Sequence, residues 1–103
     1  MNCTKAEIVD RIADATGIMK LETEAIVDGF LKTVKDVLKN GTSIELRGFG
    51  TFSVKHRKSH IGRNPKTGKI IPVDSYFTPH FKVSKELKST VNETMQTRRN
   101  GNR

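Results

Sequence analysis

A dense group of cationic side chains marks the middle of this 103-residue chain. Residues 55–69 contain six basic side chains and no acidic one. The six are Lys55, Arg57, Lys58, Arg63, Lys66 and Lys69. A polar, cationic hairpin has little apolar surface of its own to bury, so an anionic partner must offset the cost of ordering it. Nucleic acid is the most obvious partner of this kind.

The net charge of the chain, +8, is unevenly distributed. Residues 1–45 carry six basic and eight acidic side chains, whereas residues 46–103 carry thirteen basic and three acidic ones. A basic surface confined to one part of a domain is typical of a phosphate-binding face, because each neutralised phosphate releases counterions.

The segment Gly62 to Val73 reads GRNPKTGKIIPV and contains the strongest turn signal in the chain. Pro65 fixes φ at a turn position, and Gly68 tolerates the left-handed conformation that such turns require. The cationic segment is therefore predicted to be a β-arm, residues 55–73, that turns at Asn64 to Gly68.

Other chemistry fits these residues poorly. Gly62 and Gly68 are separated by five residues, not the four of a phosphate-binding P-loop, and Ile70 stands where that loop needs Ser or Thr. His56 and His60 are four apart, which suits a metal site only on a helix, and this segment has a strand pattern. The single cysteine, Cys3, and the scattered histidines supply no nucleophile or metal set. We therefore expect no enzyme activity, no cofactor and no metal.

Two helices are predicted before the basic region. The first, residues 4–16, starts with Thr4 and Glu7, which fit a capping box, and ends at Gly17, which suits a left-handed cap. The second, residues 20–39, has apolar residues at helical spacing but no good N-cap. The short link between them predicts an antiparallel pair.

Beyond Asn40 and Gly41 the apolar period changes to two, which predicts strands. A turn containing Gly48 and Gly50 should join the first two strands, with these glycines supplying positive φ or close packing. Residues 74–83 form a weaker third strand that Pro79 should interrupt, at an edge or bulge. Ser84 is expected to cap a short last helix, and residues 96–103 to form a disordered basic tail.

The chain is too small to bury a large core alone. It is one domain by length, and only 34% of its residues are apolar. Five phenylalanines are buried more easily between two subunits than inside one, so we predict a homodimer. Residues 1–10 lack the apolar centre of a signal peptide, and no apolar run could span a membrane. We expect a cytoplasmic protein with no membrane and no small-molecule substrate as partner.

The order of these features resembles one family. A helix pair, a GFGTF turn, a GRNPKTG arm tip, a further strand and a final helix together resemble the bacterial histone-like family of HU and integration host factor, over about residues 2–93. The resemblance implies an α+β fold with an N-terminal antiparallel helix pair, a three-stranded antiparallel sheet with an extended β-arm, and a short C-terminal helix. It also implies an intertwined dimer, homodimeric or with a paralogue, whose arms lie in the DNA minor groove.

The resemblance assigns roles to individual residues. Pro65 would be the wedge at a base step, with Arg63 and Asn64 beside it in the minor groove and Lys66 and Lys69 on the phosphates. The remaining DNA contacts implied are Lys55, Arg57, Lys58, Lys85 and Lys88. The implied dimer core consists of Phe30, Phe49, Phe52 and Phe81. This sequence departs from the family at Tyr76 and Phe77, which occupy strand positions that are frequently basic.

The sequence thus predicts a DNA-binding domain of residues 1–95 followed by the tail. Its expected function is architectural: to bend and compact double-stranded DNA, in association with the nucleoid. The alternative is a basic adaptor that uses the arm to bind RNA or an acidic protein. Whether DNA binding would be sequence-specific is left open, because such specificity arises from DNA deformability.

Overall fold

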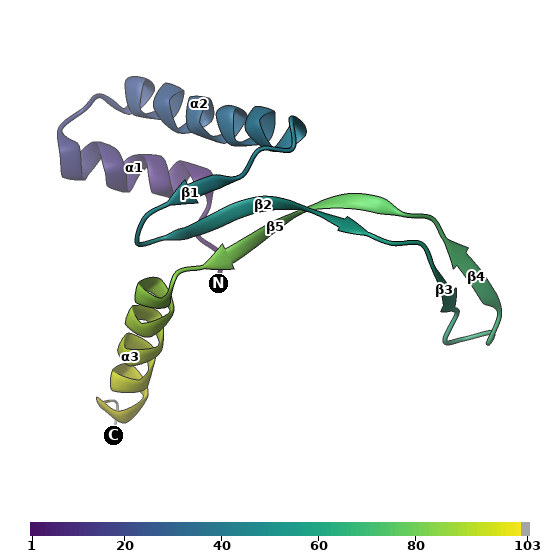
Figure 1. The fold of residues 1–103 in the computed structure, drawn as a ribbon. Helices are drawn as coiled ribbons and strands as arrows, with labels where there is room; N and C mark the ends of the chain where they lie inside the picture. The colour runs from purple at the N-terminus through teal and green to yellow at the C-terminus, as the bar shows by residue number, and fades with distance from the viewer. Residues whose placement is uncertain (102–103) are drawn as a thin grey trace. The chain divides into compact units, whose positions relative to one another are not determined.

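The computed structural model describes residues 1–101, and these divide into two compact units, Met1–Val37 and the part that begins at Leu38. The first unit contains the helix pair, and the second contains five strands and a C-terminal helix (Figure 1). The observed elements confirm the predicted α+β class and the predicted order of helices and strands.

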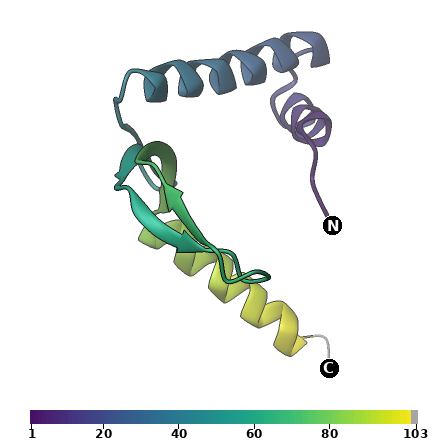
Figure 2. The same ribbon diagram turned by 90° about the vertical axis from the view of Figure 1, so that its right-hand side faces the viewer.

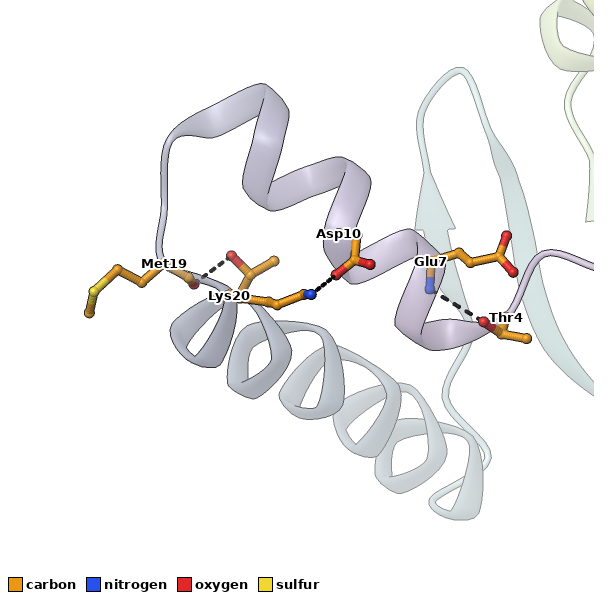
Figure 3. A network of polar contacts seen from close by, with 6 residues as sticks. Thr4, Glu7, Asp10, Met19 and Lys20 are labelled. Atoms are coloured by element: carbon orange, nitrogen blue, oxygen red, sulfur yellow. Dashed lines mark hydrogen bonds and ion pairs between the residues drawn. The ribbon is translucent and has the colours of Figure 1, made fainter.

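Helix α1, Lys5–Thr16, begins and ends as the sequence predicts. The Thr4 side chain accepts a hydrogen bond from the Glu7 backbone N–H, at 3.3 Å (Figure 3). This bond satisfies one of the free amide groups of the first turn. At the other end Gly17 adopts φ 77°, and its N–H donates to the Ala13 carbonyl at 2.9 Å.

Within residues 1–101, no side chain caps the N-terminus of helix α2, Lys20–Lys39. Its first turn is held differently: the Met19 carbonyl accepts both the N–H and the hydroxyl of Thr23, at 2.9 and 3.0 Å. Figure 3 shows this carbonyl and its bond to a hydroxyl group. Thr23 is buried, and its hydroxyl is satisfied by this hydrogen bond to the Met19 carbonyl. At the C-terminal end Gly41 takes φ 75° and its N–H bonds to the Leu38 carbonyl, as the sequence predicts.

Two ion pairs join the helices in antiparallel order. Lys5 of α1 contacts Asp28 of α2, with 2.7 Å between nitrogen and oxygen. Asp10 of α1 contacts Lys20 of α2 at the same distance (Figure 3). The hydrogen bonds to the carboxylates raise the pKa of both lysines above its ordinary value. A lysine whose pKa is raised by folding stabilises the fold at pH values below its pKa in the unfolded chain. This stabilisation is lost as the pH rises through the pKa in the folded chain. Both pairs are exposed, so their contribution is small.

The second unit is built on a three-stranded antiparallel sheet in the order β1-β2-β5. Strand β1 is Ile44–Leu46, β2 is Gly50–Arg57 and β5 is Tyr76–Val83. Strands β2 and β5 run side by side in both views (Figures 1 and 2) and pair along their full length, from Gly50 opposite Val83 to Arg57 opposite Tyr76.

Pro79 does not interrupt the third strand, which corrects one prediction. It lies within β5, directly opposite Val54. The predicted edge position is confirmed, because β5 is the outer strand of the sheet. A proline, which lacks an N–H donor, is tolerated there because one side of an edge strand makes no ladder hydrogen bonds.

The two glycines of the β1–β2 turn have different functions. The Phe49 N–H donates to the Leu46 carbonyl at 2.9 Å, and Gly48 takes φ 80° at the third turn position, where a β-carbon would be strained. Gly50 instead permits close packing: a β-carbon there would lie 2.5 Å from the Phe81 ring and 2.6 Å from the Lys82 carbonyl oxygen.

Beyond the sheet, β3 (His60–Arg63) and β4 (Ile70–Val73) form a separate two-stranded hairpin. The predicted arm of residues 55–73 is therefore divided: residues 55–57 belong to the three-stranded sheet, and the hairpin itself begins at His60. Two residues link β2 to β3, and two link β4 to β5. Figure 1 shows the hairpin continuing outward from these two strands.

The last helix is longer than predicted. Ser84 caps α3, Lys85–Gly101, by accepting from the Leu87 N–H at 3.1 Å, as expected. The helix is not short, and residues 96–101 are helical where a disordered tail was predicted. Gln96, Arg98 and Arg99 are good helix formers, and the two arginines, in the last turn, complement the helix dipole. The rest of that predicted tail, 102–103, lies outside the described residues.

We predict that Gly50→Ala destabilises the fold by roughly 1–3 kcal/mol, because the added methyl must displace either Phe81 or backbone. Gly29→Ala in α2 is the matched control, since a β-carbon there meets nothing within 4 Å and should stabilise the helix. Urea unfolding at one protein concentration measures both. Equal stability of the two variants would show that Phe81 moves aside freely.

Candidate nucleic-acid interface

The register of β2 and β5 separates their side chains into two chemically different faces. Residues opposite each other in an antiparallel pair lie on the same face, and successive residues alternate. One face, here called the cationic face, includes Lys55, Arg57 and Lys82, with Thr51, Ser53, Tyr76, Thr78 and His80 between them. The other, here called the aromatic face, carries Phe52, Val54, His56, Phe77, Pro79 and Phe81.

The cationic face brings together predicted and unpredicted residues. Lys55 and Arg57, both predicted DNA contacts, lie on it and are exposed. Lys82 lies opposite Thr51 on the same face and is a candidate that the sequence reasoning missed. The signal was available: Lys82 alternates in phase with Tyr76, Thr78 and His80. Only the register of β5 against β2, however, shows that this alternation places Lys82 on the same face as Lys55 and Arg57.

Tyr76 and Phe77, the departures from the family pattern, point to opposite faces. Tyr76 pairs with Arg57 on the cationic face, whereas Phe77 pairs with His56 on the aromatic face. The rings of His56 and Phe77 stack with centroids 4.7 Å apart. Of the two departures, only Tyr76 therefore lies beside the cations.

Lys58 lies between the two sheets, in the link from β2 to β3. Its carbonyl oxygen is 3.4 Å from Nδ1 of His60. Lys58 thus stands where the cationic face passes into the hairpin, with its side chain exposed.

The tip of the hairpin is held by its own hydrogen bonds. The Asn64 N–H donates to the Lys69 carbonyl at 2.8 Å, and the Gly68 N–H to the Asn64 carbonyl at 2.7 Å. The side chains of Asn64 and Thr67 accept from the N–H groups of Lys66 and Lys69, at 2.9 and 3.2 Å. Oδ1 of Asn64 is therefore engaged in shaping the turn. Gly68 takes φ 70°, as predicted for this position.

This turn displays the residues predicted to meet DNA. Arg63, Pro65, Lys66 and Lys69 are all exposed. Arg63 pairs with Ile70, so it shares a hairpin face with Ile61, Ile70 and Pro72. Ile61 and Ile70 are 76% and 60% exposed, which leaves an apolar strip beside the arginine.

Lys85 and Lys88 lie in the first turn of α3, three residues apart and exposed. The start of this helix is fixed to the sheet, because the Ser84 N–H donates to the Phe49 carbonyl at 3.0 Å. The free amide groups and the dipole of a helix N-terminus favour anions, so the two lysines reinforce an existing preference.

Within residues 1–101, the cations of this surface form no ion pair. Across residues 1–101, both ion pairs join α1 to α2, and neither involves a candidate DNA contact. The same residues contain no group of three or more His, Cys, Asp or Glu side chains placed to hold a metal ion. Nor does any described helix have both the length and the apolar character needed to cross a membrane.

Comparison with known proteins identifies the family. The family model described as bacterial DNA-binding protein matches residues 3–92. The chain belongs to the bacterial DNA-binding protein family of HU and integration host factor. Its members are DNA-binding proteins and not enzymes, as the sequence predicts.

Relatives match over nearly their whole length. Integration host factor subunit beta of Pseudoalteromonas atlantica is 41% identical over 93 residues, which cover 89% of this chain and 97% of the relative. The same subunit of Pseudomonas fluorescens is 42% identical over 91 residues, covering 87% and 93%.

Solved structures show the same HU-like fold. Anabaena HU in a cocrystal with DNA has a TM-score of 0.80 and 30% identity, covering 86% of this chain and 97% of that one. HU from Thermotoga maritima has a TM-score of 0.61 and 27% identity, covering 86% and 98%.

We predict that Lys82→Gln weakens the salt dependence of DNA binding. Each lost phosphate contact should reduce the slope of log K against log salt by about 0.9. Lys32→Gln, an exposed lysine of α2, removes the same charge outside the candidate interface and serves as the control. Fluorescence anisotropy titrations at several salt concentrations measure both. Identical slopes for wild type and Lys82→Gln would show that Lys82 does not contact a DNA phosphate.

Proposed function

We propose that this protein is an architectural factor that bends and compacts double-stranded DNA, with the paired arms of a dimer in the minor groove and Pro65 inserted at a base step. One observation carries the proposal: the exposed cationic face of β2 and β5 continues into a hairpin whose exposed tip is Pro65. HU and integration host factor are standard examples of proteins that kink DNA from the minor groove, and the mechanism is carried over from that family.

The electrostatic part of this function comes from unneutralised cations. In the proposed complex Lys55, Arg57 and Lys58 contact the DNA backbone at the base of the arm, and Lys66 and Lys69 contact it near the tip. Lys85 and Lys88 add contacts from the start of α3. Such contacts fix the position of the duplex without reading its sequence. They also make affinity strongly salt-dependent.

The bending part depends on the arm tip. Unstacking one base step costs a few kcal/mol, which the wrapped backbone contacts must offset. Pro65 has a rigid ring and no N–H donor, so it can fill the opened step without burying an unsatisfied group. Arg63 and Asn64 lie next to it in the minor groove in this proposal. The turn hydrogen bonds of Asn64 hold the ring in place before DNA binds.

The proposed dimer follows from phenylalanines that the chain leaves exposed. Phe81 contacts Phe49 and Phe52, with ring centroids 5.5 and 4.7 Å apart, yet Phe49 is 48% and Phe81 39% exposed. Phe30 of α2 is 50% exposed. We propose that a second chain covers these four rings. A homodimer is the simplest arrangement, and the name of the relatives, subunit beta, makes a paralogous chain the alternative partner.

An intracellular site of action follows from the proposal: a protein that compacts bacterial DNA acts in the cytoplasm, on the nucleoid. The competing function, a basic adaptor for RNA or an acidic protein, uses the same arm but requires no DNA bending. A duplex labelled with a dye pair at its ends separates the two. The ends should approach each other when the protein binds, and an unchanged end-to-end distance would favour the adaptor.

We predict that Pro65→Ala reduces DNA bending far more than it reduces affinity. Every cation is retained, so the electrostatic contribution to affinity remains, while the wedge is lost. Dye-pair distances on intact and nicked duplexes measure this, because a nicked step is already flexible and should restore much of the bending. Equal bending of an intact duplex by wild type and Pro65→Ala would show that Pro65 is only a turn residue.

We also predict that Phe49→Ala lowers stability by about 3–5 kcal/mol, the range for truncating a buried phenylalanine. In the isolated chain Phe49 is half exposed, and so large a loss requires a partner that buries it. Ile61→Ala on the arm is the control and should change stability little. Urea unfolding at matched concentration measures both. A Phe49→Ala loss as small as that of Ile61→Ala would indicate that no second chain covers this face.

A further inference from the structure

Helix α3 carries a line of hydrogen-bond donors along one side. Its members follow each other at intervals of three and four residues, which places them on one face of a helix. They are Lys85, Lys88, Asn92, Gln96 and Arg99, here called the basic stripe. All five are exposed, and none is acidic. Ammonium, amide and guanidinium groups can all donate to phosphate oxygens.

A second line on the same helix sets its orientation. Leu87, Val91 and Met95 are four residues apart and line one groove together with Val83, and this groove is bordered by Lys88, Ser89 and Asn92. Val91 and Met95 are 53% and 58% exposed, so this apolar stripe is available to pack against protein. The basic stripe lies about a quarter of a turn around the helix from it. Packing of the apolar stripe would therefore place Lys88 and Asn92 at the edge of the contact and leave Gln96 and Arg99, which do not line this groove, exposed.

The basic stripe begins at the interface described above. The bond from the Ser84 N–H to the Phe49 carbonyl fixes the start of α3 beside the β1–β2 turn, and Lys85 follows directly. From Lys85 to Arg99 the helix rises about 21 Å, at 1.5 Å per residue. Along a duplex this spans about six base pairs, at 3.4 Å per phosphate of one strand. The part from Asn92 to Arg99 rises about 10 Å and so spans about three base pairs.

The outer part of α3 lies beyond the residues that the family model matches. The family model ends at residue 92, whereas α3 continues to Gly101. Gln96 and Arg99 therefore extend the stripe beyond the region that the family model describes. Arg98, the neighbouring residue, is in line with Leu87, Val91 and Met95 instead, about 100° around the helix from Arg99. Both arginines border a hollow that Met95 and Gln96 also line.

We propose that the basic stripe is a second DNA-backbone contact, in which Gln96 and Arg99 hold the phosphates about three base pairs beyond Asn92. This lengthens the duplex segment that the protein covers without adding sequence readout. The inference rests on the proposed architectural function and adds to it a binding surface on the C-terminal extension. The ligand is the sugar-phosphate backbone of duplex DNA.

The test compares Arg99→Gln with Arg98→Gln in the full chain. Both remove one positive charge from the last turn, and glutamine is a good helix former, so the helix should be retained. Circular dichroism confirms retention. Arg99→Gln should reduce the salt slope of DNA binding by about 0.9 for each bound copy of α3, and Arg98→Gln should leave it close to wild type.

A series of duplexes that differ by single base pairs locates the contact. The shortest duplex that gives full affinity should be about three base pairs shorter at each α3-bound end for Arg99→Gln than for wild type. Equal effects of the two arginine variants would show that only net charge matters, and equal minimum lengths would place α3 away from DNA. Either result overturns the inference.

Lys66→Ala distinguishes this failure from failure of the proposed function. If Lys66→Ala flattens the salt dependence and Arg99→Gln does not, the arm binds DNA and the α3 contact is wrong. If neither variant changes the slope and wild type leaves the duplex unbent, the architectural function itself is wrong, and the α3 inference fails with it.

Discussion

Apolar surface that the chain leaves uncovered is the constraint on which the rest of the structure depends. Among residues 1–101, Val9 is the only apolar side chain that is buried, while Phe30, Phe49, Phe77 and Phe81 are 39–73% exposed. A chain of this size gains stability mainly by removing such surface from water. The proposed second chain would bury this exposed apolar surface. The cations that bind DNA must then lie on a surface that the second chain does not cover.

The alternation of β2 and β5 meets both requirements at once. Because successive strand residues point to opposite faces, one pair of strands presents Phe52 and Phe81 on one side and Lys55, Arg57 and Lys82 on the other. A slip of one residue in register would exchange the faces. It would also replace Gly50 by a residue that has a side chain, and a β-carbon at this position would collide with the Phe81 ring. The arm has no such core, and the turn hydrogen bonds of Asn64 and Thr67 order it.

The sequence predicted the features that depend on local chemistry. Thr4, Gly17 and Ser84 cap the helices as expected, and the arm tip turns at Asn64 to Gly68. It failed where neighbours in space decide: Pro79 is tolerated because β5 is an edge strand, and Lys82 was missed because its face depends on the register with β2. The tail was misjudged from its polarity, although Gln96, Arg98 and Arg99 are good helix formers that continue α3. The roles of the DNA contacts and the dimer remain predictions.

The most direct test of this account is the dependence of stability on protein concentration, combined with the mass of the free protein. If a second chain covers the aromatic face, the unfolding temperature should rise over about a hundredfold increase in concentration, because dissociation accompanies unfolding. Sedimentation equilibrium should then give a mass twice the 11.6 kDa of one chain. A concentration-independent unfolding temperature together with a monomer mass would contradict the account.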